Sequence, residues 1–183
     1  ANLTHESFTK DLDSVITEAS KLGVKRLSVT GSSVKDSLEA FEITQRYPKT
    51  CISTAGIHPH NAKEYSTAAY SEIKDLLKND LVKSIGETGL DFNRNFSSPG
   101  DQQKSFEAHL ELSIELNKPL FLHERDAHKK FVEITSLYLK DLPKSVVHCF
   151  TGTEEALKKY LDMGFYIGIT GWLCDERRGK HLE

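Results

Sequence analysis

The spacing of apolar residues changes repeatedly along the chain between the period of a helix and that of a short strand. Residues 6–22 carry apolar side chains at steps of three and four, which predicts a helix that ends at Gly23. Residues 25–30 are rich in strand formers and are closed by Gly31, which predicts a strand. The alternation continues, with further strands predicted at 51–57, 82–86, 119–123, 145–149 and 165–170, and helices at 33–47, 61 or 66 to 79, 101–117, 127–139 and 154–163.

Strands that alternate with helices of this length predict parallel βαβ units. Six strands are clear, and Asn2-Leu3 is a candidate remnant of one more. An open doubly wound sheet of this size would be complete in 183 residues, whereas a TIM (β/α)8 barrel would still lack a strand. Both architectures fit the spacing. Because no linker, low-complexity tract or charge block divides the chain, we expect a single domain over residues 1–183.

Composition narrows the function classes without naming one. The 24 Lys and Arg against 27 Asp and Glu give a net charge of −3, so the chain has no overall basic footprint for nucleic acid. The mean hydropathy of −0.45 and the lack of a long apolar run predict no membrane span. Cys51, Cys149 and Cys174 are far apart and outside CxxC spacing, which argues against a disulfide framework or a structural zinc site. We therefore expect a cytoplasmic protein without membrane contact.

Four successive predicted strands have a histidine or glutamate at or just after their carboxyl end. These residues are His58 in the segment His58-Pro59-His60, Glu87, His123 and His148. The carboxyl ends of parallel strands share one edge, where catalytic groups gather. Imidazole and carboxylate suit a divalent cation such as zinc, manganese or magnesium. One such residue could be a surface or capping group, but four at the same structural place favour a metal site. The other histidines, His5, His109, His128 and His181, fall on predicted helices or at the chain end, where we expect no role in this site.

Five separated segments resemble, in the same order, the TatD family of metal-dependent deoxyribonucleases. They are GIHPH (56–60), SIGETGLDFNRNFSSP (84–99), PLFLHERDAH (119–128), VVHCFTG (146–152) and YIGITGWLCDERRG (166–179). ANLT at residues 1–4 resembles the end of the first strand of the family, so the resemblance covers the whole chain. It implies an α/β TIM barrel of the metal-dependent hydrolase type, incomplete here with about seven strands and the eighth missing.

The resemblance also implies roles for individual residues. Glu87, His123 and His148 match the metal ligands of the family, and His58 matches a further active-site histidine. Asp91 in the GLDF segment matches a motif residue that would support the loop of Glu87. We therefore expect His58, Glu87 and Asp91 to be catalytic, and a divalent metal ion, Mg²⁺ with Mn²⁺ or Zn²⁺ as alternatives, to be held by Glu87, His123 and His148.

The chain departs from the family pattern in two places. Many relatives carry a His-x-His pair on the first strand that holds a second metal, whereas this chain has Asn2 where that pair would end. The last metal-site residue of the family is an aspartate after the eighth strand, and this sequence stops before it. The first departure argues against full occupancy by two metals. The second predicts greatly reduced or lost activity and keeps an inactive truncated fragment among the alternatives.

Cationic and aromatic residues beside the metal-site segments are candidates for contact with nucleic acid. They are Arg94, Phe96, Arg125, Trp172 and Arg177. Other interpretations stay open: a surface ion pair for Arg125, a plug of the barrel mouth for Trp172, and a solvated charge run for Arg177. The residues alone indicate a metal-dependent hydrolase, and the resemblance implies the leading hypothesis, a monomeric 3′→5′ exonuclease on single-stranded DNA or RNA. The alternative is a hydrolase of an aminoacyl-tRNA or a small ester or amide on the same metal site.

Overall fold

The computed structural model describes residues 1–175, 179 and 180, and its strands form one parallel sheet. The six strands pair in chain order: β1 (Leu27–Val29), β2 (Cys51–Ala55), β3 (Val82–Asp91), β4 (Leu120–Arg125), β5 (Val146–Val147) and β6 (Tyr166–Ile167). The helices are α1 (Leu12–Lys21), α2 (Val34–Arg46), α3 (Thr67–Leu76), α4 (Pro99–Leu116), α5 (His128–Tyr138) and α6 (Glu154–Asp162), with 3-10 turns η1 (Glu6–Phe8), η2 (Pro59–Glu64) and η3 (Gly171–Cys174).

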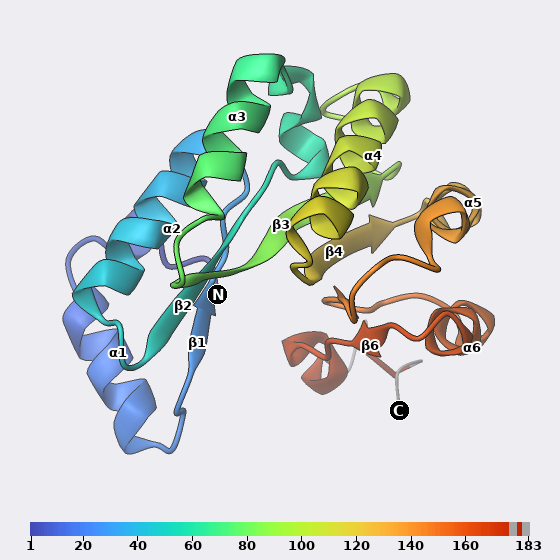
Figure 1. The fold of residues 1–183 in the computed structure, drawn as a ribbon. Helices are drawn as coiled ribbons and strands as arrows, with labels where there is room; N and C mark the ends of the chain where they lie inside the picture. Colours follow the sequence, from blue (N-terminus) through green and yellow to red (C-terminus); the bar gives the residue numbers. More distant parts are fainter. Residues whose placement is uncertain (176–178, 181–183) are drawn as a thin grey trace.

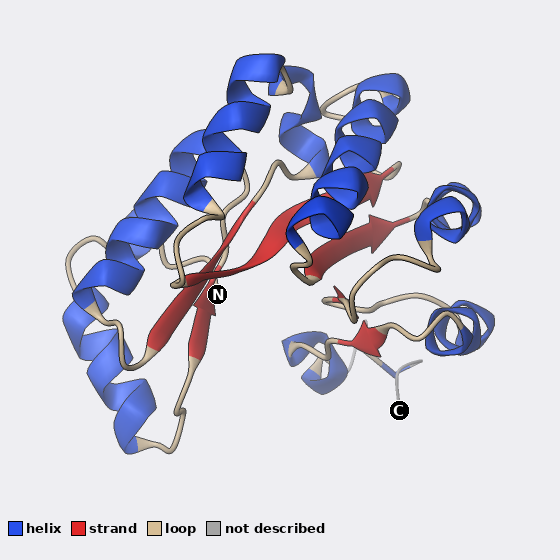
Figure 2. Cartoon of the chain, in the orientation of Figure 1, coloured by secondary structure: helices blue, strands red, loops and turns tan. Residues whose placement is uncertain are grey.

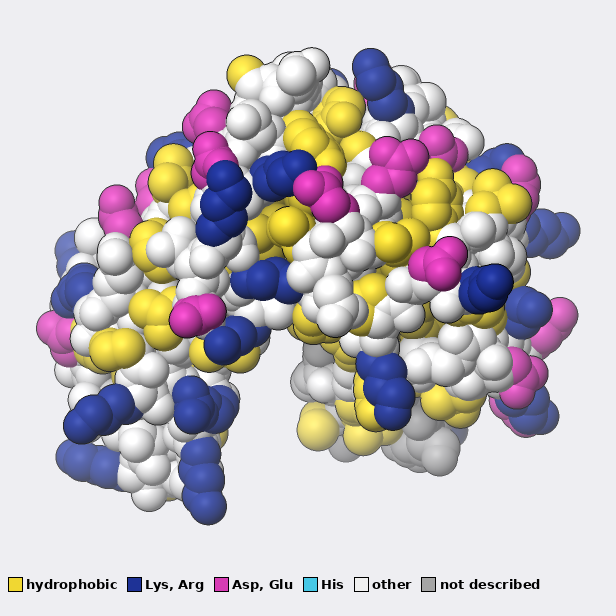
Figure 3. All heavy atoms as spheres, viewed as in Figure 1, with side chains coloured by type: hydrophobic (Ala, Val, Ile, Leu, Met, Phe, Trp, Pro, Cys, Tyr) yellow, Lys and Arg dark blue, Asp and Glu magenta, His cyan; other side chains and the backbone are white. Residues whose placement is uncertain are grey.

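The order of the strands decides between the two architectures that the spacing allowed. A doubly wound sheet reverses its strand order at a switch point, whereas here each strand pairs in parallel with the next one along the chain. The sheet curls into half a barrel, and the helices lie along its outer side (Figures 1 and 2). The surface is deeply hollowed between the part that carries α1 and the part that carries β6 (Figure 3). The barrel prediction is therefore confirmed.

Six of the predicted strands are present, with different limits. Asn2 and Leu3 are not in a strand, but the amide of Thr30 donates to the Ala1 carbonyl at 3.0 Å, so the first residue lies beside β1. The predicted helix at 6–22 is instead η1 followed by α1. The helix proposed from residue 61 or 66 is η2 followed by α3, whose N-cap is Ser66.

The largest difference concerns β3, which we expected to end at Gly86. It continues to Asp91, because its pairing with β4 runs on through Gly89 opposite His123 and Asp91 opposite Arg125. Gly89 has φ +143°, and a Cβ there would lie 1.9 Å from the His123 carbonyl oxygen, so only glycine allows this approach. Glu87 therefore lies within a strand rather than after one, and so does His123.

The hydrophobic core has two parts. The larger lies between β2–β6 and helices α3–α6, and includes Ile85, Leu122, Phe106 and Phe131. The smaller joins β1 to α1 and α2. These layers hold the carboxyl ends of the strands in place. No helix in the described residues is long and apolar enough to cross a membrane.

Candidate active site

Three imidazole nitrogens converge on one carboxylate oxygen at the carboxyl edge of the sheet. Glu87 Oε1 lies 2.6 Å from His148 Nε2, 3.1 Å from His123 Nδ1 and 3.3 Å from His58 Nε2. His58 follows β2, His123 lies within β4 and His148 directly follows β5, so three separate strands bring a histidine to the glutamate of β3. The ligand atoms of His58, Glu87 and His123 all lie within 4.8 Å of one another. The three expected ligands, Glu87, His123 and His148, are thus brought together, and His58 joins them. We call these four residues the cluster.

Asp91, four residues after Glu87 on β3, is the centre of a second group of contacts. Its Oδ2 lies 2.8 Å from His60 Nε2 and 3.3 Å from His123 Nε2, while its Oδ1 accepts the backbone N–H groups of Asn93 and Arg94. His123 therefore bridges the two carboxylates through its two ring nitrogens. We expected Asp91 to support the loop of Glu87. In the structure its carboxylate contacts His60 and His123, and so orients one of the expected ligands directly.

The electrostatics of the cluster follow from burial and hydrogen bonding. Burial raises the pKa of the Glu87 carboxyl, but the bonds from His123, His148 and His58 outweigh it and hold that pKa well below its usual range. Burial also raises the pKa of Asp91, and the bonds from His123, the Arg94 amide and His60 again lower it. Both carboxyls are ionised at neutral pH.

The histidines respond in opposite directions. Burial lowers the pKa of His123, but Asp91 and Glu87 outweigh burial and raise it to about 9. Burial dominates at His58 and lowers its pKa. The cluster thus combines ionised carboxylates with convergent imidazoles. That donor set fits a divalent cation, because borderline metals prefer imidazole nitrogen together with carboxylate oxygen.

Helix α4 anchors the backbone around Asp91 through Gln102. The Gln102 side chain is fully buried; its Oε1 accepts the Asp91 N–H at 2.8 Å, and its Nε2 donates to the Asp91 and Ser97 carbonyls at 3.0 Å each. Ser97 Oγ in turn donates to the His60 carbonyl and accepts the Lys63 N–H. One side chain therefore fixes the backbone of Asp91 and, through Ser97, the turn that carries His60.

The same helix holds the end of β2 through His109. Its Nε2 accepts the Ile57 N–H at 3.2 Å, and its Nδ1–H donates to the Ser105 carbonyl at 2.7 Å. Ile57 immediately precedes His58, so His109 positions the backbone next to a metal-site histidine without touching the cluster. Burial lowers the pKa of His109 to about 4, which keeps the imidazole neutral for this pair of bonds.

Sequence reasoning missed the parts played by His60, Gln102 and His109. His60 had a signal, since it lies in the His-Pro-His segment at the end of a strand. Gln102 and His109 also had one: they are polar residues seven positions apart in a helix, on the face that carries Phe106 and Leu110. Buried polar side chains on such a face must find partners, and those partners are the backbone groups of the site.

Two of the expected nucleic-acid contacts lie directly beside His60. The ring centre of Phe96 is 4.8 Å from that of His60, edge to face, and the Phe96 side chain is 56% exposed. The Arg94 guanidinium carbon lies 5.9 Å from the centre of the Phe96 ring. These two residues form an open platform on one side of the cluster.

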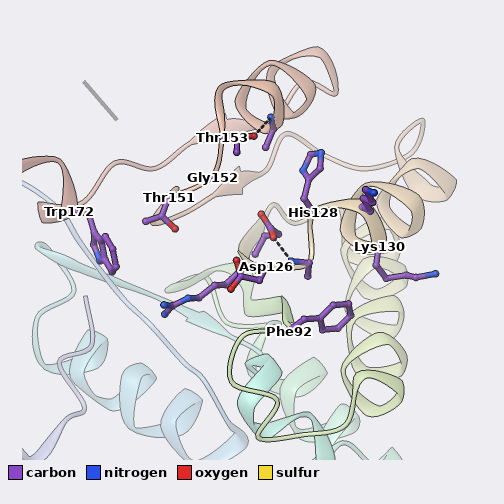
Figure 4. A pocket seen from close by; sticks show the side chains of 13 residues that line it. Phe92, Asp126, His128, Lys130, Thr151, Gly152, Thr153 and Trp172 are labelled. Atoms are coloured by element: carbon purple, nitrogen blue, oxygen red, sulfur yellow. Dashed lines mark hydrogen bonds between the residues drawn. The ribbon is translucent and has the colours of Figure 1, made fainter. Parts of the chain in front are cut away.

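Two of the other expected contacts belong to a different feature of the surface, a cavity. Arg125 and Trp172 line a cavity of about 690 Å³ together with Phe92 and the first turn of α5 (Figure 4). Arg177, the last predicted contact, lies outside the described residues. The structure thus places four of the nucleic-acid candidates in two groups, the platform beside His60 and the cavity.

The parallel half-barrel with histidines and carboxylates at the carboxyl ends of its strands defines the class of TIM-barrel metal-dependent hydrolases. Within that class, the family model described as TatD related DNase matches residues 1–183, and the chain belongs to this family. Relatives from Escherichia fergusonii and Salmonella typhimurium, both named 3'-5' ssDNA/RNA exonuclease TatD, are 46% identical over 182 residues, which is 100% of this chain and 70% of theirs.

Solved structures give the same fold. A TatD family hydrolase from Entamoeba histolytica superposes with a TM-score of 0.87 at 29% identity, over 93% of this chain and 63% of that one. An uncharacterised amidohydrolase from Saccharomyces cerevisiae gives 0.85 at 28% identity, over 93% and 66% of the two chains. A TatD homologue from Escherichia coli K12 gives 0.88 at 23% identity, over 98% and 69%, and supports the fold alone. The chain therefore spans about two thirds of the length of these solved relatives.

Proposed function

We propose that this chain acts as a metal-dependent exonuclease that removes nucleotides from the 3′ end of single-stranded DNA or RNA. The observation that carries the proposal is the convergence of His58, His123 and His148 on one oxygen of Glu87. Membership of the TatD related DNase family and the names of the 46% identical relatives support the substrate and the direction.

We assign a divalent cation, Mg²⁺ with Mn²⁺ or Zn²⁺ as alternatives, to Glu87, His123 and His148, with His58 beside it. When bound, the cation would activate water as a nucleophile and stabilise charge on the phosphate. Asp91 fixes the orientation of His123 through its 3.3 Å contact. His58 is kept neutral by burial and can accept or position a proton near the phosphate. The platform of Arg94 and Phe96 offers a cation for the backbone and a ring for a base.

The proposal extends to the setting of the protein. We propose a monomer in the cytoplasm. The free thiols of Cys51, Cys149 and Cys174 are consistent with a reducing compartment. Sedimentation of the purified chain measures its oligomeric state, and a dimer would contradict this part of the proposal.

Cleavage of a single-stranded oligonucleotide labelled at its 5′ end tests the function. We expect a ladder that shortens from the 3′ end, abolished by a chelator and restored by Mg²⁺, Mn²⁺ or Zn²⁺ to different extents. The Glu87→Gln variant should lose about a thousandfold or more in rate, because it removes the charge that the histidines share. Glu115→Gln is the matched control, since Glu115 pairs with Lys74 on the outer surface.

Four results would contradict the proposal. Equal rates for the two variants would remove Glu87 from the site. Internal cuts, or shortening from the 5′ end, would contradict the direction. Metal-dependent hydrolysis of an aminoacyl ester or a small cyclic amide, with no cleavage of the oligonucleotide, would favour the alternative hydrolase, and no metal-dependent reaction at all would favour an inactive fragment.

A further inference from the structure

Strands β3 and β4 lead from the cluster to the lining of the cavity. Phe92 directly follows Asp91, the last residue of β3. Arg125 lies two residues beyond His123 on β4, so the Arg125 and His123 side chains are on the same face of the sheet. The opposite walls are the first turn of α5, the loop at 151–153 and Trp172 of η3 (Figure 4). Its volume of about 690 Å³ lies within the roughly 300 to 1,000 Å³ typical of small-molecule sites. A strand bound at the cluster can therefore place its next nucleotide in the cavity.

The charges around the cavity favour an anion. Its two acidic residues are already engaged: Asp126 accepts from the Asn93 side chain at 2.7 Å, and Glu124 accepts from Tyr160 Oη at 2.7 Å and from the Ala127 N–H at 2.8 Å. In contrast, the Arg125 guanidinium has no ion pair or hydrogen bond among the described residues. A half-buried guanidinium without a partner is suited to a phosphate, which it can bind through two parallel hydrogen bonds.

The rings of the cavity favour a nucleotide over a simple anion. The Trp172 and Phe92 side chains lie among its lining residues, and every base offers a face on which such rings can stack. The platform of Arg94 and Phe96 and the cavity also differ in shape. The platform of Arg94 and Phe96 is open, so a strand can continue across it, whereas the cavity has walls on several sides. An exonuclease needs one subsite that accepts only the end of the strand.

We propose that this cavity, the terminal-nucleotide pocket (Phe92, Arg125, His128 and Trp172), binds the nucleotide at the 3′ end of the strand. The inference rests on the proposed function and names its substrate subsite. On cleavage, water adds a hydroxyl to phosphorus, the bond from phosphorus to the 3′ oxygen breaks, and that oxygen takes the remaining proton. The released product is a nucleoside 5′-monophosphate, whose phosphate faces Arg125.

The sole tryptophan of the sequence provides the test, because Trp172 lines the pocket. Thymidine 5′-monophosphate is titrated into the wild-type chain in Mg²⁺ buffer, with indole excited at the red edge where thymine does not absorb. We expect saturable quenching, weakened about tenfold by Arg125→Met, which removes one charge-assisted contact. Lys158→Met is the control, because Lys158 pairs with Glu154 on the outer surface of α6.

Two further titrations locate the ligand. Phe96→Ala on the open platform should leave binding of the monophosphate unchanged while it weakens binding of an oligonucleotide. Inorganic phosphate alone should compete weakly. Absence of saturable quenching, equal weakening in Arg125→Met and Lys158→Met, or phosphate that competes as well as the nucleotide would each overturn the pocket. Circular dichroism confirms that Arg125→Met remains folded.

The titration does not depend on catalysis, so the two proposals fail separately. Saturable quenching without cleavage of an oligonucleotide supports the pocket and contradicts the proposed exonuclease. Cleavage from the 3′ end without quenching overturns the pocket and leaves the exonuclease intact.

Discussion

The half of the sheet that carries Glu87 and Asp91 is built differently from the half that carries His148. β3 has ten residues and pairs with β4 from Ile85 to Asp91, whereas β5 and β6 have two residues each. Helix α4 buries eight residues against the first half, while α6 buries only Ala156 and Tyr160 against the second. Near β6, Tyr166 and Ile169 are each 58% exposed.

The two halves of the sheet contribute different residues to the site. His58, His60, Glu87, Asp91 and His123 come from the closely paired half, where α4 fixes even the peptide groups between them. His148 and much of the cavity wall come from the half with little strand pairing. Most of the cluster is thus held by the extensive half, while His148 and the cavity wall formed by residues 151–153 and Trp172 come from the half with short strands.

Of the changes that test this difference between the halves, replacement of Gln102 by leucine should lower the free energy of unfolding most. It removes three hydrogen bonds and leaves the Asp91 N–H and two carbonyls buried without partners. We expect a loss of about 4 kcal/mol in the free energy of unfolding. Gln103→Leu is the matched control, since its side chain bonds only the Pro99 carbonyl of its own helix, and should change stability by less than about 0.5 kcal/mol. Urea unfolding of both variants measures the difference, and equal losses would contradict a special role for α4.

The sequence predicts the parallel alternation, the six strands and the edge where His58, Glu87, His123 and His148 meet, because these depend on local spacing. It does not predict that β3 continues through Gly86 and Gly89, because glycine in a strand depends on how closely the β4 carbonyls approach. The contacts of Gln102 and His109 are likewise invisible locally, since their partners lie 11 and 52 positions away.

Acid should lower the free energy of unfolding through His109, which lies in the half that carries Glu87 and Asp91. Its pKa of about 4 in the folded chain lies below the ordinary value near 6.5, so between these values the unfolded chain binds more protons. The contribution of neutral His109 to the free energy of unfolding is therefore complete above pH 6.5. It is lost as the pH falls towards 4, by about 3 kcal/mol in total. Urea unfolding across this range should show a shallower pH slope for His109→Gln than for the wild type. Parallel slopes would mean that His109 does not bury its neutral form.

Amide exchange compares the two halves in the wild-type chain. The Ile85 N–H bonds the Pro119 carbonyl at 2.9 Å, and the Gly168 N–H bonds the Val147 carbonyl at 2.8 Å, so the two bonds are of matched length. Because β5 and β6 pair over few residues, we expect Gly168 to open at a free energy about 2 kcal/mol lower, which is about thirtyfold faster exchange after correction for intrinsic rates. Nuclear magnetic resonance measures both amides, and equal protection would show that the halves open together.

The smallest effect should come from Tyr160, the main polar anchor of α6. Its hydroxyl donates to Glu124 at 2.7 Å and accepts from His128 Nδ1 at 2.9 Å, and burial raises its pKa. Tyr160→Phe keeps the buried ring and removes both bonds, but water can reach the half-buried Glu124 and His128 from the cavity. We therefore expect a loss of about 1 kcal/mol in thermal unfolding, against no change for Tyr166→Phe on the exposed strand β6. A loss as large as that of Gln102→Leu would contradict the comparison, because it would show that polar anchoring is as stringent beside the cavity as it is behind the cluster.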